Sequence, residues 1–327
     1  MIRYEDKYLI YDSPKKLGIK YIIKYSLARL LQPYYKIKYK IFSPSVTKKK
    51  YYASICAIFR DEGKYLREWI EYHKLIGIDH FYLYNNFSKD DYLQILKPYI
   101  EDDLVTLTDW DIPQGQMAAY ADCVKRYSSE TNWIGFIDLD EFVVPNQDNS
   151  IKEFLTRFIS RPIVIIYWRC LGSSGLVSRN LEKPVTESFI VGWKKYIDIG
   201  KLFFNTAYDY ANELPQNMYM HHRWARYKGH RLPPVNCFNH SCIYGENIVS
   251  DSDMPESNDI PIQINHYLIK SFDEYAEKKK RGGGVHKDMH DMAYFWRIDQ
   301  KSCMPDYHIF KYMIKLKLAL NSKLEKR

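Results

Sequence analysis

The chain has 327 residues and a formal net charge of +8, from 48 Lys and Arg against 40 Asp and Glu. Hydrophobic residues make up 46% of it and charged residues 27%, which excludes general disorder and provides enough apolar side chains for one large or two small domains. No stretch approaches the roughly 18–20 consecutive apolar residues of a membrane-spanning helix, and we expect no signal peptide because the start lacks an apolar segment.

The positive charge is concentrated at the two ends of the chain. Residues 1–50 hold thirteen Lys and Arg against three Asp and Glu, and residues 308–327 hold six against one. These ends have net charges of +10 and +5, which leaves −7 for residues 51–307. A nucleic-acid-binding protein needs a basic face on its folded body, so we expect no nucleic-acid partner. Basic ends on an acidic body instead predict contact with an anionic membrane surface.

We expect three parts along the chain. Residues 1–50 form a basic N-terminal extension that contains a helix over Leu17–Leu31. Residues 51–307 form the main domain, and residues 308–327 form a basic amphipathic helix whose apolar side chains recur every three to four residues. Those apolar side chains either pack on the main domain or contact a membrane.

Strands and helices alternate in the first half of the main domain, residues 51–169. Short apolar runs predict strands at Ala53–Phe59, His80–Tyr84, Leu104–Thr108, Trp133–Ile137 and Pro162–Trp168. Helical spacing predicts helices at 65–77, Tyr92–Ile100, Met117–Tyr127 and Ile151–Phe158. This alternation predicts an α/β fold in which a mostly parallel twisted sheet has helices on both faces. Residues 170–265 break the alternation, and we expect loops and short strands of the same domain there.

Two carboxylates follow the fourth predicted strand. Asp138 and Asp140 come directly after the apolar run that begins at Trp133. Residues i and i+2 of an extended segment point to the same side, and two like charges there are costly unless a cation bridges them. Mg²⁺ and Mn²⁺ prefer such oxygen ligands and usually also bind substrate phosphates. The pattern predicts a divalent metal, although Asp-x-Asp is common and a strand end with surface acids has the same sequence.

Polar clusters also follow the first two predicted strands, where a parallel sheet binds its ligands. We expect these residues to hold a nucleotide: Arg60, Asp61, Glu62, Asn85, Asn86 and Ser88. Arg60 suits a phosphate or the face of a base, and the Asn and Ser side chains suit base or ribose edges. The alternative for the second cluster is a loop that ends in a helix N-cap, at Ser88 or Asp90. The absence of a Walker loop and of Gly-x-Gly-x-x-Gly after a strand disfavours a kinase-like NTPase and a dinucleotide oxidoreductase.

Several motifs between about residues 53 and 285 are shared with one known family. They are Ser54-Ile-Cys-Ala-Ile-Phe-Arg60-Asp-Glu62, Trp69-Ile-Glu-Tyr-His73, Tyr84-Asn-Asn, Gln116-x-x-Ala-Tyr120-x-Asp122-Cys, Trp133 to Phe142, Gly172-Ser-Ser-Gly175, Asn265-His266-Tyr267 and Lys279-Lys-Arg281-Gly282. Together they resemble glycosyltransferase family 92. The resemblance implies a GT-A fold, a nucleotide-sugar donor that is often UDP-galactose, a divalent metal and inversion at the anomeric carbon.

The resemblance also implies roles for individual residues. The metal ligands would be Asp138, Asp140 and His266, although a lone His is more often a packed or surface residue. The donor-binding residues would be Arg60, Asp61, Glu62, Asn85, Asn86, Ser88, Tyr120, Asp122, Asp138, Leu139, Lys270 and Arg281. Lys270 and Arg281 would close over the diphosphate, with Gly282–Gly284 allowing that segment to move; the alternative is a solvated run of charges.

An inverting transfer also needs a base that takes the proton of the acceptor hydroxyl. Glu187 is the first candidate and His222 the second, and each is as readily explained by a structural role. The segment 185–230 departs from the pattern of the family, so the resemblance does not assign this base.

These observations predict a metal-dependent, inverting glycosyltransferase that transfers a sugar, with galactose expected, from a UDP-sugar. The expected acceptor is a surface glycan such as capsule, lipopolysaccharide or O-antigen, free or linked to a lipid. Eukaryotic family members carry a membrane anchor and this sequence shows none, so we expect a bacterial enzyme, cytoplasmic and peripheral on the inner face of the membrane. The alternatives are a metal-dependent nucleotidyl- or phospho-sugar transferase and a non-catalytic, membrane-associated glycan- or nucleotide-binding protein.

Overall fold

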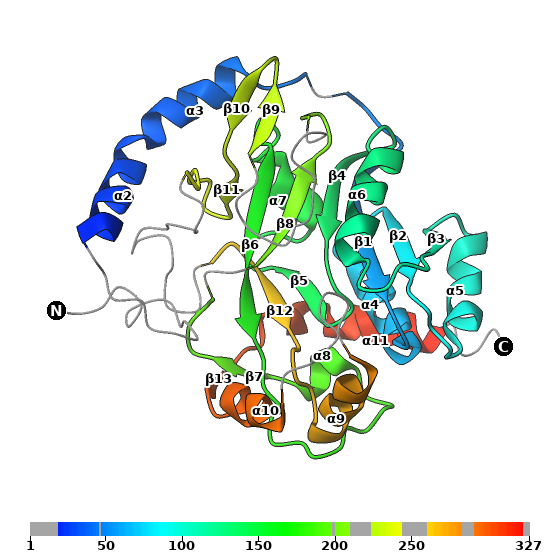
Figure 1. Cartoon of the computed structure of the whole chain (residues 1–327). Coiled ribbons are helices and arrows are strands. Elements are labelled where there is room, and N and C mark those ends of the chain that lie inside the picture. Colours follow the sequence, from blue (N-terminus) through cyan, green and yellow to red (C-terminus); the bar gives the residue numbers. More distant parts are fainter. Residues whose placement is uncertain are drawn as a thin grey trace.

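The computed structural model describes residues 19–45, 47–197, 200–209, 224–243, 260–282 and 291–322. Within them, one large twisted sheet forms the centre of the molecule (Figure 1). Its order is β3-β2-β1-β4-β8-β6-β12-β5, and β11 pairs with β6 beside that path. A large hydrophobic cluster surrounds the sheet, which is why most of its strands are buried along their full length.

The first half of the sheet follows the alternation expected from the sequence. Its four parallel strands are β1 (Tyr51–Phe59), β2 (His80–Asn85), β3 (Val105–Asp109) and β4 (Thr131–Phe136). The helices between them are α4 (Gly63–Leu75), α5 (Tyr92–Glu101) and α6 (Gln116–Tyr127). All seven elements agree with the predicted ranges to within about two residues at most ends, so the α/β class is confirmed.

The second half of the sheet mixes directions. Its strands are β5 (Glu141–Pro145), β6 (Ile163–Cys170), β8 (Gly200–Asn205), β11 (Val235–Asn236) and β12 (Ile262–His266), with α7 (Ile151–Thr156) between β5 and β6. β8 pairs antiparallel with β4 and β6, and β5 pairs antiparallel with β12; the other strands share one direction. Residues 170–265 thus supply β8 and β12 to the interior of the sheet, a larger part than the loops and short strands expected there.

A smaller layer lies below the main sheet in Figure 1. It contains α8 (Val185–Ser188), α9 (Phe272–Arg281), α10 (Met292–Asp299) and the two-stranded ribbon of β7 (Val191–Trp193) and β13 (Ser302–Pro305). A second hydrophobic cluster joins Trp193 of β7, Tyr275 of α9 and Phe295 of α10. This layer places α9 beside the end of β12.

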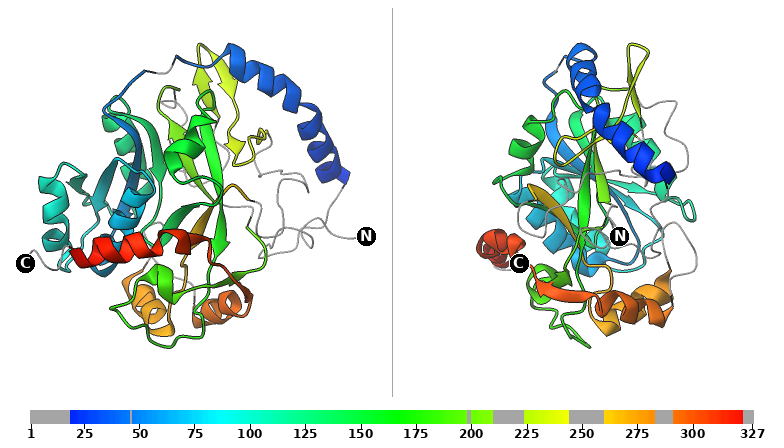
Figure 2. Two further views of the ribbon diagram at one scale, coloured as in Figure 1. Left: turned by 180° about the vertical axis from the view of Figure 1, so that it is seen from behind. Right: turned by 90° about the vertical axis from the view of Figure 1, so that its left-hand side faces the viewer.

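Helices from both ends of the chain lie on the outside of the body. α2 (Ile19–Leu30) and α3 (Gln32–Ile41) run along one edge, next to the hairpin of β9 (Ala225–Tyr227) and β10 (His230–Leu232) (Figures 1 and 2). After the short η1 (His308–Tyr312), α11 (Met313–Ser322) crosses the back beside α4 (Figure 2). Met313 and Leu316 of α11 are buried against the body. Of the two alternatives expected for this helix, its apolar face therefore packs on the main domain. Of the helices that the structure describes, none has the length and hydropathy that a membrane span requires.

The strand directions bring several chain segments to one edge of the sheet. β1, β2, β4 and β12 end at this edge, and the antiparallel strands β5 and β8 begin there. Gly200 allows β8 to start so close to β6, because a Cβ at this position would lie 1.8 Å from the carbonyl oxygen of Ile166. The next residue, Lys201, therefore enters the same edge.

Candidate active site

The acidic motif lies in the short turn that joins β4 to β5. Asp138 and Asp140 follow β4, and Glu141 is the first residue of β5. The indole Nε1 of the fully buried Trp69, on α4, donates hydrogen bonds to the carbonyl oxygens of Asp138 at 3.1 Å and Glu141 at 2.9 Å. These bonds hold the turn against α4 and fix the direction of its carboxylates.

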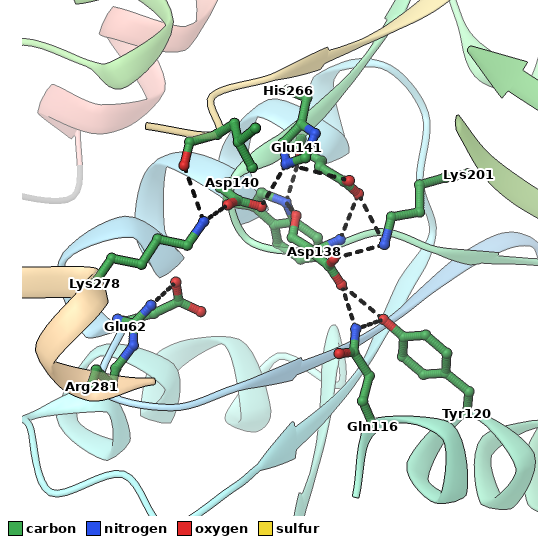
Figure 3. Close-up of polar contacts among 12 residues, drawn as sticks. Glu62, Gln116, Tyr120, Asp138, Asp140, Glu141, Lys201, His266, Lys278 and Arg281 are labelled. Carbon is green, nitrogen blue, oxygen red and sulfur yellow. Dashed lines mark hydrogen bonds and ion pairs between the residues drawn. The ribbon is translucent and has the colours of Figure 1, made fainter. Parts of the chain in front are cut away.

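Strand β12 brings a histidine to this turn. His266 lies directly opposite Glu141 in the antiparallel pairing of β12 with β5. His266 Nε2 is 3.7 Å from Asp140 Oδ1 and 3.9 Å from Glu141 Oε1 (Figure 3). The backbone N–H of Tyr267 donates to the carbonyl oxygen of Asp140 at 2.8 Å, which joins the turn to the end of β12. One potential ligand atom from each of Asp140, Glu141 and His266 lies within 4.8 Å of the other two.

The chemistry of these three side chains fits a divalent cation. They offer two carboxylate oxygens, the ligands that Mg²⁺ and Mn²⁺ prefer, and one imidazole nitrogen. Glu141 Oε1 is buried and has no hydrogen-bond partner among the described residues. A buried carboxylate oxygen without a partner is costly, and a bound cation would satisfy it.

Asp138 has a different set of partners. Its Oδ1 accepts hydrogen bonds from Gln116 Nε2 at 2.9 Å and from the Tyr120 hydroxyl at 2.8 Å, both on α6 (Figure 3). Its Oδ2 is 2.7 Å from the ammonium of Lys201, at the start of β8. Lys201 Nζ is also 3.4 Å from Glu141 Oε2. One buried ammonium therefore lies between two carboxylates of the turn.

Burial and neighbouring charges shift the pKa values of the cluster in different directions. Burial raises the pKa of Asp140, but neighbouring cations, Lys278 above all, outweigh it and hold the pKa well below its usual range. Burial raises the pKa of Glu141 well above its usual value, although Lys201 opposes this. Burial lowers the pKa of His266 to about 4. The imidazole is thus neutral at neutral pH, which is the form that binds metals.

A pocket of 630 Å³ opens beside the cluster. Its walls come from the segments after β1 and β2 and from the segment that leads through α9: Arg60, Asp61, Glu62, Lys64, Tyr65, Asp90, Asp91, Ile269, Lys270, Glu274, Glu277, Lys278, Lys280 and Arg281. Lys270 is buried, and its ammonium lies 4.5 Å from the centre of the Tyr65 ring. Burial lowers the pKa of Lys270 to about 8. Lys270 and Asp61 both adopt a left-handed backbone conformation, with φ of 53° and 49°, which is uncommon for residues with a side chain.

Helix α9 places two cations on acids around this pocket. Lys278 Nζ is 2.5 Å from Asp140 Oδ2. Arg281 donates to the carbonyl oxygen of Asp61 at 2.9 Å and to Glu62 Oε1 at 2.8 Å. These contacts connect the pocket to the cluster of Asp140, Glu141 and His266 and hold α9 against the segment after β1 (Figure 3).

The sequence pattern of glycosyltransferase family 92 matches residues 49–278, which carry this turn, the end of β12 and most of α9. The chain belongs to glycosyltransferase family 92. Membership places it among the glycosyltransferases.

Curated proteins of plants and a nematode resemble parts of this family 92 chain. It is 33% identical over 108 residues to a glycosyltransferase family 92 protein of Ricinus communis, covering 29% of this chain and 20% of that protein. It is 34% identical over 120 residues to the beta-1,4-galactosyltransferase galt-1 of Caenorhabditis elegans, covering 32% and 28%. It is 29% identical over 149 residues to the galactan beta-1,4-galactosyltransferase GALS3 of Arabidopsis thaliana, covering 41% and 30%. The matched segments span less than a third of these relatives, and the bacterial origin expected from the sequence stays a prediction.

Solved structures with a similar arrangement are distant in sequence. The structure of S. aureus TarS 1–349 in complex with UDP-GlcNAc has a TM-score of 0.35 and 13% identity, over 48% of this chain and 46% of that one. The structure of GalNAc-T7 with UDP, GalNAc and Mn²⁺ has a TM-score of 0.27 and 11% identity, over 52% and 33%.

The donor-binding residues expected from the family resemblance fall into three groups. Those that line the pocket are Arg60, Asp61, Glu62, Lys270 and Arg281. A second group comprises Asp138 and Leu139 of the acidic turn and Tyr120 and Asp122 of α6. Tyr120 binds Asp138 directly, Leu139 is buried within the turn, and Asp122 accepts from the Tyr84 hydroxyl at 2.8 Å.

The polar residues after β2 make hydrogen bonds within the protein. Asn85 Nδ2 donates to Asp109 Oδ1 at 2.9 Å, and Asn86 Nδ2 donates to two carbonyl oxygens of the segment after β3. Ser88 Oγ accepts from the backbone N–H of Asp61 at 3.0 Å. None of the three is among the residues that line the pocket, so in this structure they shape the loops around it.

The structure places only one of the two candidate bases. Glu187 lies on α8, and its carboxylate is 2.7 Å from the Lys317 ammonium of α11. It does not line the pocket. His222 lies outside the described residues.

The sequence reasoning did not assign Glu141, Lys201 or Lys278 to the site. Glu141 follows Asp140 directly, and its position at the head of a new strand is a signal that could have raised it to a ligand candidate. Lys201 stands in a segment without alternating pattern, and Lys278 begins a run of four basic residues. Only the pairing of distant strands and the course of α9 bring these two to the acids.

Proposed function

We propose that this chain is a metal-dependent, inverting glycosyltransferase that transfers galactose from UDP-galactose to a surface-glycan acceptor, free or lipid-linked. The observation that carries the proposal is the buried cluster of Asp140, Glu141 and His266 beside a pocket with buried and half-buried cations. A nucleoside diphosphate brings two phosphates, which need positive charge, and a divalent cation, which needs oxygen ligands.

Asp140, Glu141 and His266 would hold the cation. Such an ion would neutralise negative charge on the diphosphate as it leaves. Without a bound cation, Lys278 holds Asp140 ionised, and the Lys201 ammonium lies between the carboxyl groups of Asp138 and Glu141. Two lysines therefore occupy positions beside three carboxyl groups, where a bound metal cation would add to their positive charge.

Lys270, Lys278 and Arg281 would bind the diphosphate itself. Lys270 is buried at the pocket with its ammonium 4.5 Å from the centre of the Tyr65 ring, and this charge would bind a phosphate. Lys278 and Arg281 sit on one helix and contact acids at both sides of the pocket. A phosphate would compete with those acids for the same donors, and α9 would then close on the bound donor.

The choice of sugar and stereochemistry is supported by the relatives. Two of them are named as β-1,4-galactosyltransferases. Because the sugar of UDP-galactose is α-linked, a single displacement at its anomeric carbon gives a β-linked product. Galactose transfer with inversion is the reaction that agrees with both the cluster and these names.

A donor screen tests the proposal without a known acceptor. The full chain is incubated with a series of UDP-sugars, with and without Mn²⁺, and the nucleotide products are separated by chromatography. We expect slow release of UDP, fastest from UDP-galactose and dependent on the metal, because water replaces the acceptor. Release of UMP or pyrophosphate would favour a nucleotidyl- or phospho-sugar transferase instead. Binding of UDP without turnover of any donor, even when glycan acceptors are added, would favour a non-catalytic binding protein.

A further inference from the structure

Helices α2 and α3 carry a continuous apolar stripe on their outer side. On α2 the stripe consists of Ile19, Ile23, Leu27 and Leu30, and on α3 it consists of Tyr34, Ile37 and Ile41. The spacing is three or four residues throughout, including the step from one helix to the next, so all seven side chains share one face. They are between 42% and 77% exposed, and the described residues do not cover them.

A different face of the same helices attaches them to the body. Ala28, Tyr35 and Tyr39 are buried in the main core, and the Tyr39 hydroxyl donates to the carbonyl oxygen of Pro233 at 2.9 Å. Gln32 and Ser241 exchange two hydrogen bonds, at 2.9 and 2.7 Å. These core contacts account for the inner face of the helices, and no other element that the structure describes covers the outer stripe.

The charge around the stripe has one sign. Residues 19–50 contain nine Lys and Arg and no Asp or Glu. Lys36 and Lys40 are exposed on α3, and each directly precedes an apolar residue of the stripe, Ile37 and Ile41. Apolar side chains bordered by basic ones are the pattern of a helix that lies in the plane of an anionic membrane surface.

We propose that the outer face of α2 and α3 docks this protein on an anionic lipid bilayer surface. The apolar stripe would enter the headgroup region, and the flanking lysines would contact lipid phosphates. A second copy of the chain fits less well, because a self-associated pair would bring nine basic residues from each copy together with no acidic residue from these segments to oppose them. The proposal is independent of the reaction that the pocket performs.

The test compares two matched pairs of substitutions in the full chain. Ile23→Gln with Ile37→Gln removes the centre of the stripe and keeps good helix formers. Ile314→Gln with Leu318→Gln is the control, since these two side chains on α11 are 77% and 64% exposed beside basic residues but lie away from the stripe. Binding is measured by co-sedimentation with vesicles of phosphatidylcholine alone and of phosphatidylcholine mixed with phosphatidylglycerol.

We expect the unchanged chain and the α11 control to bind the mixed vesicles and to ignore phosphatidylcholine alone. The affinity of the stripe variant for the mixed vesicles should be lower by roughly tenfold or more, because two apolar side chains no longer enter the membrane. Lys36→Gln with Lys40→Gln should reduce binding by roughly fivefold for each charge. A salt concentration of about 1 M, where the screening length is about 3 Å, should weaken the binding of the unchanged chain.

Equal binding by the stripe variant and the unchanged chain would overturn the proposal, provided that both melt at the same temperature. Binding to phosphatidylcholine as strong as to the mixed vesicles would overturn the anionic part of it. Sedimentation velocity tests whether a second copy of the chain covers the stripe instead. If the unchanged chain is a dimer, and the stripe variant is a monomer with unchanged vesicle binding, a second copy covers the stripe and the membrane does not.

Discussion

Two carboxylates one residue apart have separate tasks in the turn after β4. Asp140 faces His266 and Lys278, whereas Asp138 binds Gln116, Tyr120 and Lys201 of the opposite side. Asp138 is therefore engaged by side chains of the protein, and Asp140 and Glu141 are the acids that, with His266, could hold a metal ion. The Asp-x-Asp pattern predicts acids at this point, but it does not distinguish these two environments.

Lys201 is expected to act as a positioning residue for the acids. Replacing it by Met leaves two carboxylates without their buried cation, and losing one partner of a buried ion pair costs about 3–5 kcal/mol. A bound cation supplies the missing charge. Mn²⁺ should therefore raise the melting temperature of Lys201→Met by more than that of the unchanged chain. Thermal unfolding with and without Mn²⁺ measures this difference.

The matched control is Lys97→Met on α5, whose side chain is 73% exposed. It should melt close to the unchanged chain and respond equally to the metal. An equal rise in the melting temperatures of Lys201→Met and Lys97→Met would show that Lys201 does not compensate the charge of a metal site.

The pH dependence of UDP binding is predicted from Lys270. Its pKa of about 8 results mainly from burial, which is partly opposed by Asp140 and reinforced by Lys278. Glu62 and Glu274 face it with smaller effects. A phosphate binds the protonated ammonium, so the affinity should be highest below pH 8 and should fall, by up to about tenfold per pH unit, as the pH rises through that value.

Titration calorimetry with UDP and Mn²⁺ across this pH range measures the effect. Lys270→Gln should bind UDP more weakly at neutral pH and should lack the decline above it. A decline of the same size in Lys270→Gln would assign the titration to another group.

Helix α9 is the element that couples the two sides of the site. Its N-terminus has a capping box, in which Ser271 Oγ accepts from the backbone N–H of Glu274 at 3.3 Å and the Glu274 carboxylate accepts from Ser271 in return. Its C-terminus stops at Gly282, whose φ of 85° favours glycine. The cap holds the helix that carries Lys278 and Arg281.

Removing this cap should affect donor binding more than global stability. Ser271→Ala costs about 1 kcal/mol of helix stability and loosens α9, so the KM for the donor should rise more than kcat falls. Ser150→Ala is the matched control, because Ser150 is the N-cap of α7, where its side chain accepts from the backbone N–H of Glu153 at 3.2 Å, and α7 does not line the pocket. Similar KM values for the two variants at similar loss of stability would mean that α9 has no special role in binding the donor.

The elements that the sequence predicts well are those whose partners are near in the chain. β1 to β4 are apolar runs separated by amphipathic helices, and each lies beside a strand from the same half of the sheet. β5, β8 and β12 were not predicted as members of this sheet. β5 follows β4 after a turn of four residues, and β12 finds its partners β5 and β6 some hundred residues away, so no local period reveals the pairing.

At the scale of the whole molecule, the net charge of +8 hides three regions with different structural roles. The acidic centre contains the carboxylates of the candidate site. The basic C-terminal helix lies beside α4 and packs its apolar face on the body. The burial of Met313 and Leu316 therefore needs no membrane contact. The N-terminal helices have an inner face for the body and an outer stripe for the proposed membrane contact. Composition alone could not separate these two ends, because both combine lysines with apolar residues.

The sequence predicts the two aspartates of the candidate site, but it predicts only part of the set of three side chains that could hold a metal. The strand ends, Asp138, Asp140 and the motif around His266 are visible in the sequence, and the structure brings Asp140 and His266 together. Glu141 joins them because the pairing of β5 with β12 sets it opposite His266. The pairing register of β5 with β12 brings Glu141 into the set, and a single sequence does not contain that register.

We propose that Asp140, Glu141 and His266 hold a metal that serves a UDP-sugar. Titration calorimetry of UDP binding in the presence and absence of Mn²⁺ tests it most directly, with Asp140→Asn compared against Asp102→Asn at an exposed helix end. We expect Mn²⁺ to strengthen UDP binding in the unchanged chain and in Asp102→Asn, and to have no such effect in Asp140→Asn. Equal enhancement by Mn²⁺ in Asp140→Asn and Asp102→Asn would contradict the account.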